Sequence, residues 1–174
     1  MRAVLDACVL YPTVMRGVLV GLAARSLYEP IWSPRILEEW RRAAARHPPG
    51  AGAEIALLSE RFPQAEVVAP FRDDLSLPDP DDVHVLSAAI AAEAGAIVTL
   101  NLGDFPTRVL ARHDVLRMHP DAFAVDLLAE APEAVRETCE DVLATAKALS
   151  GEDWTMRALL KKARLPRLGK ALDR

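Results

Sequence analysis

Carboxylate side chains recur at four separated places along this chain of 174 residues. Each place lies on, or at the end of, an expected strand or helix: Asp6, Glu38–Glu39, Asp79–Asp82 and Asp104. Carboxylates that meet at one point repel each other strongly unless a cation lies between them. Ligand sets made only of oxygen favour Mg²⁺ or Mn²⁺, whereas zinc prefers histidine and cysteine. If these acids converge, the chemistry they support is that of a hard divalent ion.

Short apolar segments alternate with helical ones along the first two thirds of the chain. The expected strands are residues 2–6, 31–32, 67–68, 96–100 and 115–118. This alternation predicts an α/β fold in which helices cover both faces of a parallel sheet. Such sheets bind ligands at the carboxyl ends of their strands, where Asp6 and Asp104 stand. Glu38–Glu39 and Asp79–Asp82 lie on helices that follow loops, so they can face the same edge.

Helix signals place the remaining elements. Ser33 before Pro34 predicts an N-cap and a first helical residue, and Asp79 before Pro80 predicts the same. Other helices are expected at about 12–28 and 52–62 and after Pro106. Beyond residue 120 every segment is predicted helical: 121–130, 132–149, 154–163 and 166–173. The sequence therefore predicts a domain over 1–120 and a C-terminal helical extension over 121–174, packed on or beside it.

Each acid also has a structural interpretation. Asp79 can cap its helix, and acids in the first helical turn favour the positive end of the helix dipole. Three acids exceed what a cap needs, so at least one is expected to bind metal, with Asp82 first and Asp79 second. Asp104 follows Gly103 in a turn, where a solvated Asp is common.

Glu38 and Glu39 are neighbours on a helix and point about 100° apart, so at most one is expected at the site. Periodicity does not choose between them. Thr99 and Asn101 are either hydrogen-bonding partners near the same edge or ordinary strand and turn residues. His84 is expected to be structural or exposed and not a general base.

Composition bounds the class of protein. No apolar stretch reaches the roughly 18 residues of a membrane helix, and the start does not resemble a signal peptide. Two cysteines are too few for a disulfide framework, so a reducing cytoplasm is the expected location. The formal net charge is −4, but residues 154–174 carry seven Lys or Arg and one acid. This basic segment is either a polyanion-binding surface or the solvated face of terminal helices.

Three segments together resemble PIN-domain ribonucleases, the nuclease fold shared by VapC-type toxins: VLDACVLYP, SPRILEEW and DPDDVHVLSAAIAAEAGAIVTLNLGDFP. The resemblance covers residues 1 to about 120, and the later helices resemble an extension found in one branch of the family. It implies a three-layer α/β/α fold with a central parallel sheet. The match departs at Cys8, where a threonine is common, which predicts a looser hydrogen bond near Asp6.

The resemblance also implies a site and an activity. Asp6, Glu39, Asp82 and Asp104 match the four acids of the family, with Thr99 and Asn101 in support. The implied activity is Mg²⁺- or Mn²⁺-dependent RNA hydrolysis that leaves 5′-phosphates, and the implied partners are RNA and a cognate antitoxin. The C-terminal helices, rich in Leu and Ala, are expected to pair with a second copy of the chain, to receive the antitoxin or to pack against the sheet. Three basic residues are weaker candidates for contacts with the RNA backbone: Arg41, Arg42 and Lys161.

Two other functions are compatible with parts of the sequence. A PIN-like scaffold could bind RNA or protein without cleaving, although an idle site has no reason to keep mutually repelling acids. Haloacid-dehalogenase-like hydrolases carry Asp-x-Asp after a strand, but here Cys8 is the second residue after Asp6.

Overall fold

The computed structural model describes residues 1–173, which form two compact units. The first unit contains Met1–Tyr11 and Tyr28–Met118, and the second contains Pro12–Leu27 and residues 119–173. The change of unit at Met118 lies near the expected boundary at residue 120. Pro12–Leu27, however, belong to the same unit as the later helices. Because packing alone does not test independent folding, the division into domains over 1–120 and 121–174 stays a prediction.

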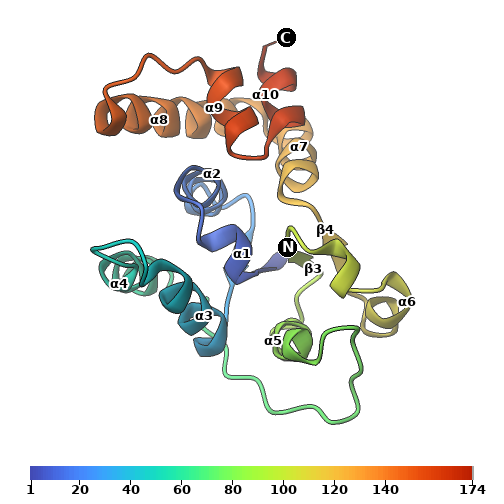
Figure 1. Cartoon of the computed structure of the whole chain (residues 1–174). Helices are drawn as coiled ribbons and strands as arrows, with labels where there is room; N and C mark the ends of the chain where they lie inside the picture. Colours follow the sequence, from blue (N-terminus) through green and yellow to red (C-terminus); the bar gives the residue numbers. More distant parts are fainter. Residues whose placement is uncertain (174) are drawn as a thin grey trace. The chain divides into compact units, whose positions relative to one another are not determined.

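A parallel sheet of four strands forms the centre of the first unit (Figure 1). The strands are β1 (Arg2–Leu5), β2 (Glu29–Ile31), β3 (Ala96–Val98) and β4 (Leu116–Met118), in the order β2-β1-β3-β4. Ala3 of β1 is in register with Pro30 on one side and Ala96 on the other. The apolar residues of β1 and all of β3 are fully buried, as expected for central strands covered on both faces. The α/β fold class predicted from the sequence is confirmed.

Helices and short 3-10 turns connect the strands of this unit. The helices are α1 (Ala7–Leu10), α3 (Pro34–Ala44), α4 (Gly52–Arg61), α5 (Val83–Ala91) and α6 (Thr107–Leu110). The 3-10 turns are η1 (Pro80–Asp82), η2 (Leu102–Asp104) and η3 (Ala111–His113). Helix α5 packs against β1 and β3, and α1 packs against α3. Helix α3 begins as predicted, because the Ser33 hydroxyl accepts a hydrogen bond from the backbone N–H of Ile36 at 3.2 Å.

One strand predicted from the sequence is absent. Residues 67–68 form no strand, and the only sheet-like pairing near them is a single bridge between Trp32 and Glu66. Residues 67–79, called here the 67–79 loop, have no regular secondary structure. Val68 is 82% exposed and Phe71 is 89% exposed. The prediction was wrong because a β-branched pair favours a strand only where neighbouring strands bury it.

The second unit is helical. It consists of α2 (Thr13–Ala24), α7 (Pro120–Glu130), α8 (Pro132–Ser150), α9 (Met156–Lys162) and α10 (Pro166–Leu172). Helices α2 and α8 approach closely at Gly21, where an added Cβ would lie 2.6 Å from Cγ2 of Thr138. Arg25 at the end of α2 pairs with Asp141 of α8 at 2.8 Å. Glycine at position 21 therefore permits the contact that joins Pro12–Leu27 to the C-terminal helices.

Among residues 1–173, no helix combines the length and apolar character that crossing a membrane requires. The cytoplasmic location stays a prediction.

A buried carboxylate fixes the last helix of the second unit. Asp121 is 4% exposed, and its two oxygens accept hydrogen bonds from the backbone N–H groups of Arg167 and Leu168, each at 2.9 Å. These charge-assisted bonds satisfy N–H groups that the first turn of α10 leaves without helical partners.

Replacing Asp121 by alanine should leave those N–H groups unsatisfied and lower the free energy of unfolding by about 2 kcal/mol, measured by urea denaturation. Asp126→Ala, at an exposed position of the same helix, is the control and should change stability by no more than about 0.5 kcal/mol. Equal stability of the two variants would show that the cap contributes nothing.

Candidate active site

Asp6 lies at the carboxyl end of the central strand β1. Its backbone N–H donates to the carbonyl of Val98, which extends the pairing with β3 by one residue. Its side chain is 5% exposed, and Oδ2 accepts a hydrogen bond from the Thr99 hydroxyl at 2.7 Å. Its backbone carbonyl accepts from Val9 and Leu10 in α1, a short helix that sequence reasoning did not foresee. Strand and helix together fix the carboxylate at this edge of the sheet.

Cys8 supports the same carboxylate. Its Sγ lies 3.2 Å from Oδ2 of Asp6 and accepts from the backbone N–H of Leu100 at 3.3 Å. Burial, and then the negative charge of Asp6, raise the pKa of the Cys8 thiol to about 12, so the thiol keeps its proton and can donate it to Asp6. The replacement of a common threonine by Cys8 predicted a looser hydrogen bond near Asp6. In the structure the Cys8 thiol still donates a hydrogen bond to Asp6.

Thr99 and Asn101 differ in their contributions. Thr99 is fully buried at the end of β3, and its hydroxyl both donates to Asp6 and accepts from the backbone N–H of Asn101 at 3.0 Å. Asn101 is exposed and contributes through its backbone. Thr99 is therefore a positioning residue for Asp6, as one of its two interpretations predicted.

Asp82 provides the clearest electrostatic signal at this edge. It ends η1 and directly precedes α5, and it is half-buried. Burial, followed by the negative charges of Asp6, Asp104 and Asp79, raises the pKa of the Asp82 carboxyl to about 6. Only carboxylates near one another interact in this way, because solvent screens charges that lie far apart. Acids from three separate segments of the sequence therefore lie within electrostatic range of Asp82.

Asp79 and Asp104 are held by their local turns. Oδ1 of Asp79 accepts from the backbone N–H of Asp81 at 2.9 Å, which confirms the predicted cap. The backbone N–H of Asp104 donates to the carbonyl of Asn101 within η2. Phe105, fully buried, anchors the chain directly after Asp104. Both acids project from short turns whose conformation is fixed by neighbouring backbone and core contacts.

The two neighbouring glutamates of α3 have different partners. Both oxygens of Glu38 pair with arginines of the same helix, Arg41 at 2.6 Å and Arg42 at 3.0 Å, and these bonds lower the pKa of Glu38. Oε1 of Glu39 instead lies 2.8 Å from Nε2 of His84 on α5. The structure therefore directs Glu39 toward α5 and keeps Glu38 among the arginines of its own helix.

Sequence reasoning missed Arg35 and named His84 without its partner. Nε of Arg35 lies 3.4 Å from Oε1 of Glu39, and its Nη2 lies 3.2 Å from Oδ1 of Asp81. The side chain of His84, expected to be structural or exposed, is only 12% exposed and pairs with Glu39. The available signals were the four-residue spacing from Arg35 to Glu39 and the position of His84 two residues after Asp82.

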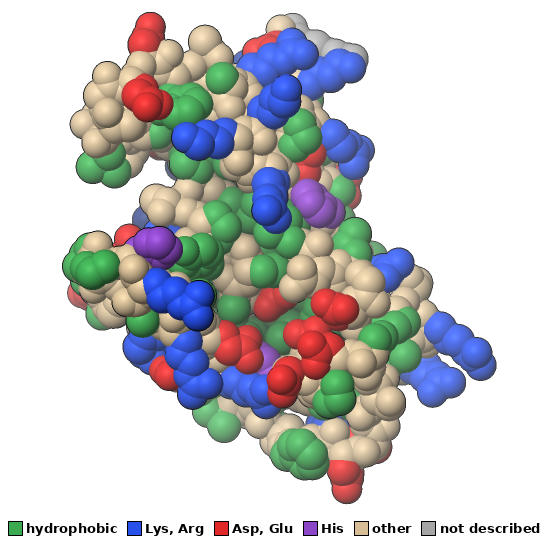
Figure 2. Space-filling view, in the orientation of Figure 1, with side chains coloured by type: hydrophobic (Ala, Val, Ile, Leu, Met, Phe, Trp, Pro, Cys, Tyr) green, Lys and Arg blue, Asp and Glu red, His purple; other side chains and the backbone are tan. Residues whose placement is uncertain are grey.

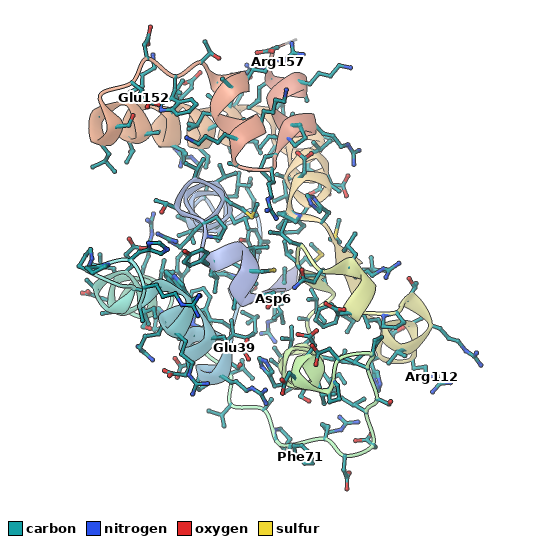
Figure 3. All side chains as sticks on the ribbon, viewed as in Figure 1. Asp6, Glu39, Phe71, Arg112, Glu152 and Arg157 are labelled. Carbon is teal, nitrogen blue, oxygen red and sulfur yellow. The ribbon has the colours of Figure 1, made fainter. Side chains whose placement is uncertain are left out.

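Acidic side chains gather in one area of the face shown in Figure 2, beside Lys and Arg side chains on α3. Figure 3 shows two members of this group, Asp6 at the end of β1 and Glu39 on α3. Among the described residues, however, no three His, Cys, Asp or Glu side chains lie close enough to bind one ion together. The donor set is all oxygen and fits Mg²⁺ or Mn²⁺. A bound cation would offset the repulsion at Asp82 and draw the carboxylates closer.

The weaker candidates for RNA contacts are dispersed. Arg41 and Arg42 already pair with Glu38. Lys161 is an exposed residue of α9 and belongs to the second unit. A role for these residues in binding RNA stays a prediction.

Comparison with known proteins identifies the family. Residues 2–103, more than half of the chain, match the model of the PIN domain. The chain belongs to the PIN-domain family. A protein of Mycobacterium tuberculosis named "Putative ribonuclease VapC50" is 32% identical over 117 residues, which are 67% of this chain and 61% of that protein. No solved structure gives a significant match.

The family match confirms the resemblance inferred from the sequence. It spans the PIN-domain segments that carry Asp6, Glu39 and Asp82, and it ends one residue before Asp104. The roles of the individual acids are therefore argued from the geometry described above.

The raised pKa of Asp82 has a consequence for stability in the absence of metal. In an unfolded chain an Asp carboxyl titrates near 3.9, whereas in the folded protein Asp82 titrates at about 6. Below about pH 4 the Asp82 carboxyl is protonated in both the folded and the unfolded state, so its raised pKa costs no free energy of unfolding. As the pH rises through 6, the folded state must ionise beside other carboxylates, so the free energy of unfolding falls.

Asp82→Asn should remove this loss. In EDTA, the melting temperature of the variant minus that of wild type should be about 2–4 °C larger at pH 7.5 than at pH 4. The expected difference is small because solvent screens part of the repulsion at this half-buried group. Asp81→Asn is the control, because the Asp81 side chain is 88% exposed. A difference between variant and wild type that does not change with pH would contradict the proposed repulsion.

Proposed function

We propose that this protein is a metal-dependent endoribonuclease that hydrolyses RNA phosphodiester bonds, and that it is the toxin of a type II toxin–antitoxin pair. The observation that carries the proposal is the electrostatic coupling of Asp6, Asp104 and Asp82 at the carboxyl edge of a PIN-domain sheet. The ribonuclease name of the Mycobacterium tuberculosis relative supports the substrate class.

The acids have distinct roles in this proposal. Asp6, Asp82, Asp104 and Glu39 would hold one or two Mg²⁺ or Mn²⁺ ions, with Asp79 as a weaker candidate. When bound, such an ion activates water and neutralises charge on the scissile phosphate. Both contacts of Glu39, with His84 and Arg35, use Oε1, so its second carboxylate oxygen, Oε2, could bind the ion while these contacts are kept.

The surrounding residues orient the carboxylates. The Thr99 hydroxyl and the Cys8 thiol hold Oδ2 of Asp6 from one side, which fixes the plane of the carboxylate. Arg117 donates to the carbonyls of Leu102 and Phe105 and so fixes the turn that carries Asp104. Rigid ligands lower the reorganisation that binding a cation requires.

The reaction proposed is a hydrolysis. A water oxygen bonds to phosphorus, the bond between phosphorus and the 3′-oxygen breaks, and that oxygen takes up a proton. The products are a 5′-phosphate and a 3′-hydroxyl, as the family resemblance implies. Direct activation of water by a metal requires no histidine base, which is consistent with the pairing of His84 to Glu39.

Partners are part of the same proposal. A toxin of this class requires an antitoxin, which we propose on the resemblance alone. We propose pairing with a second copy of the chain on the Leu- and Ala-rich C-terminal helices. The alternative function is a PIN-like scaffold that binds RNA or protein without cleavage. The observation in its favour is that no three metal-binding side chains of the described residues are already assembled.

RNA cleavage with Mg²⁺ and with Mn²⁺ tests the proposal. Asp6→Asn and Asp82→Asn should each lower the cleavage rate at least about a hundredfold, because each removes a charged ligand, and EDTA should abolish wild-type cleavage. The neighbouring glutamates supply a matched pair: Glu39→Gln should lower the rate, whereas Glu38→Gln should leave it within about threefold.

Two outcomes would contradict this mechanism. Cleavage that persists in EDTA would exclude the metal-dependent reaction. Wild-type protein that binds RNA but never cleaves it would favour the scaffold.

A further inference from the structure

A cavity of about 320 Å³ lies in the first unit, between the start of α3, the 67–79 loop and the start of α5. Six of the residues that line it carry the argument: Pro34, Arg35, Val68, Phe71, Val83 and His84. Its volume is at the lower end of the range of about 300–1,000 Å³ typical of small-molecule sites. Figure 3 labels Phe71 on the loop that forms one wall. The cavity is large enough for one flat ring system.

The cavity adjoins the carboxylates through two of its lining residues. Arg35 and His84 both contact Oε1 of Glu39, at 3.4 and 2.8 Å, and Arg35 also pairs with Asp81. A ligand in the cavity would therefore lie within one side chain of the proposed metal ligands.

The lining combines apolar surface with unused hydrogen-bonding capacity. Phe71 and Val68 are among the most exposed large apolar side chains of the described residues, at 89% and 82%. Nδ1 of His84 is buried without a hydrogen-bond partner among the described residues, whereas Nε2 lies 2.8 Å from Oε1 of Glu39. A buried donor or acceptor without a partner costs free energy that a suitable ligand would recover.

Single-stranded RNA supplies the matching chemistry. Unpaired bases stack on aromatic side chains and hydrogen-bond through their edges, and Arg pairs with phosphate oxygens. Phe71 offers the ring face, Nδ1 of His84 offers a hydrogen-bonding atom, and the half-exposed Arg35 offers the cation. Bases within a duplex are stacked and paired, so their faces and edges are not available to such side chains.

We propose that this cavity binds one unpaired nucleobase of the RNA, in the nucleotide next to the bond that is cut. This inference rests on the proposed ribonuclease function and assigns to it a contact for one base of the RNA. Phe71 is then a binding residue, and its replacement should weaken affinity for RNA.

The experiment is a binding titration with a fluorescently labelled RNA octamer in Ca²⁺, followed by fluorescence anisotropy, with the RNA checked for integrity afterwards. Eight further octamers each carry one abasic ribose. At one or two positions the loss of the base should weaken binding to wild type about tenfold. Phe71→Ala should weaken binding of the intact octamer about tenfold and show little further loss at those positions.

Two variants serve as controls. Phe71→Trp keeps an aromatic face and should bind within about threefold of wild type. Leu57→Ala removes another exposed apolar side chain of the first unit, 65% exposed on α4, and should bind as wild type does. In Mg²⁺ at saturating RNA, Leu57→Ala should cleave within about threefold of the wild-type rate.

The outcomes separate this proposal from the function on which it rests. Two results would overturn the nucleobase site alone, if cleavage is normal: equal binding of all abasic octamers, or unchanged affinity of Phe71→Ala for the intact octamer. The cavity would then be left to another occupant, such as a peptide. Base-dependent and Phe71-dependent binding without cleavage would overturn the nuclease function alone. No measurable binding of RNA by wild type would overturn the nucleobase site as well.

Discussion

Repulsion among carboxylates at the carboxyl edge of the sheet is the constraint on which the candidate site depends. Asp82 is partly buried beside three other acids, and its pKa rises to about 6 as a result. Holding these acids together costs folding free energy at neutral pH unless a cation offsets their charge. A protein without use for a cation would gain stability by losing one of them. The cost itself is thus the physical argument for an ion-dependent function.

The parallel sheet explains how acids so distant in sequence meet. Asp6 ends β1 and Asp104 lies in the turn after β3, and these two strands are adjacent in the sheet. Asp82 directly precedes α5, the helix that packs against both strands. Glu39 comes from α3 and reaches α5 through His84. Each acid is therefore held by a different element. Arg35 and His84, which contact Glu39, also line the cavity beside the 67–79 loop and so connect it to the acids.

Local signals in the sequence predicted the elements whose cause is local. The caps at Ser33 and Asp79 form as expected, since each needs only a side chain and a nearby N–H. Tertiary contacts decided the rest. Residues 67–68 lack a neighbour to complete a strand, and Pro12–Leu27 join the second unit through Gly21, neither of which is visible in periodicity. The choice between Glu38 and Glu39 likewise depends on which partners face them after folding.

Crystals grown with Mn²⁺ would show whether a hard divalent ion joins these carboxylates. The anomalous signal of manganese locates the ion independently of any assay for activity. We expect a peak within bonding distance of an Asp6 oxygen and of Asp82, Asp104 or both. The absence of a peak at this edge at saturating Mn²⁺, or manganese bound only elsewhere on the molecule, would contradict it.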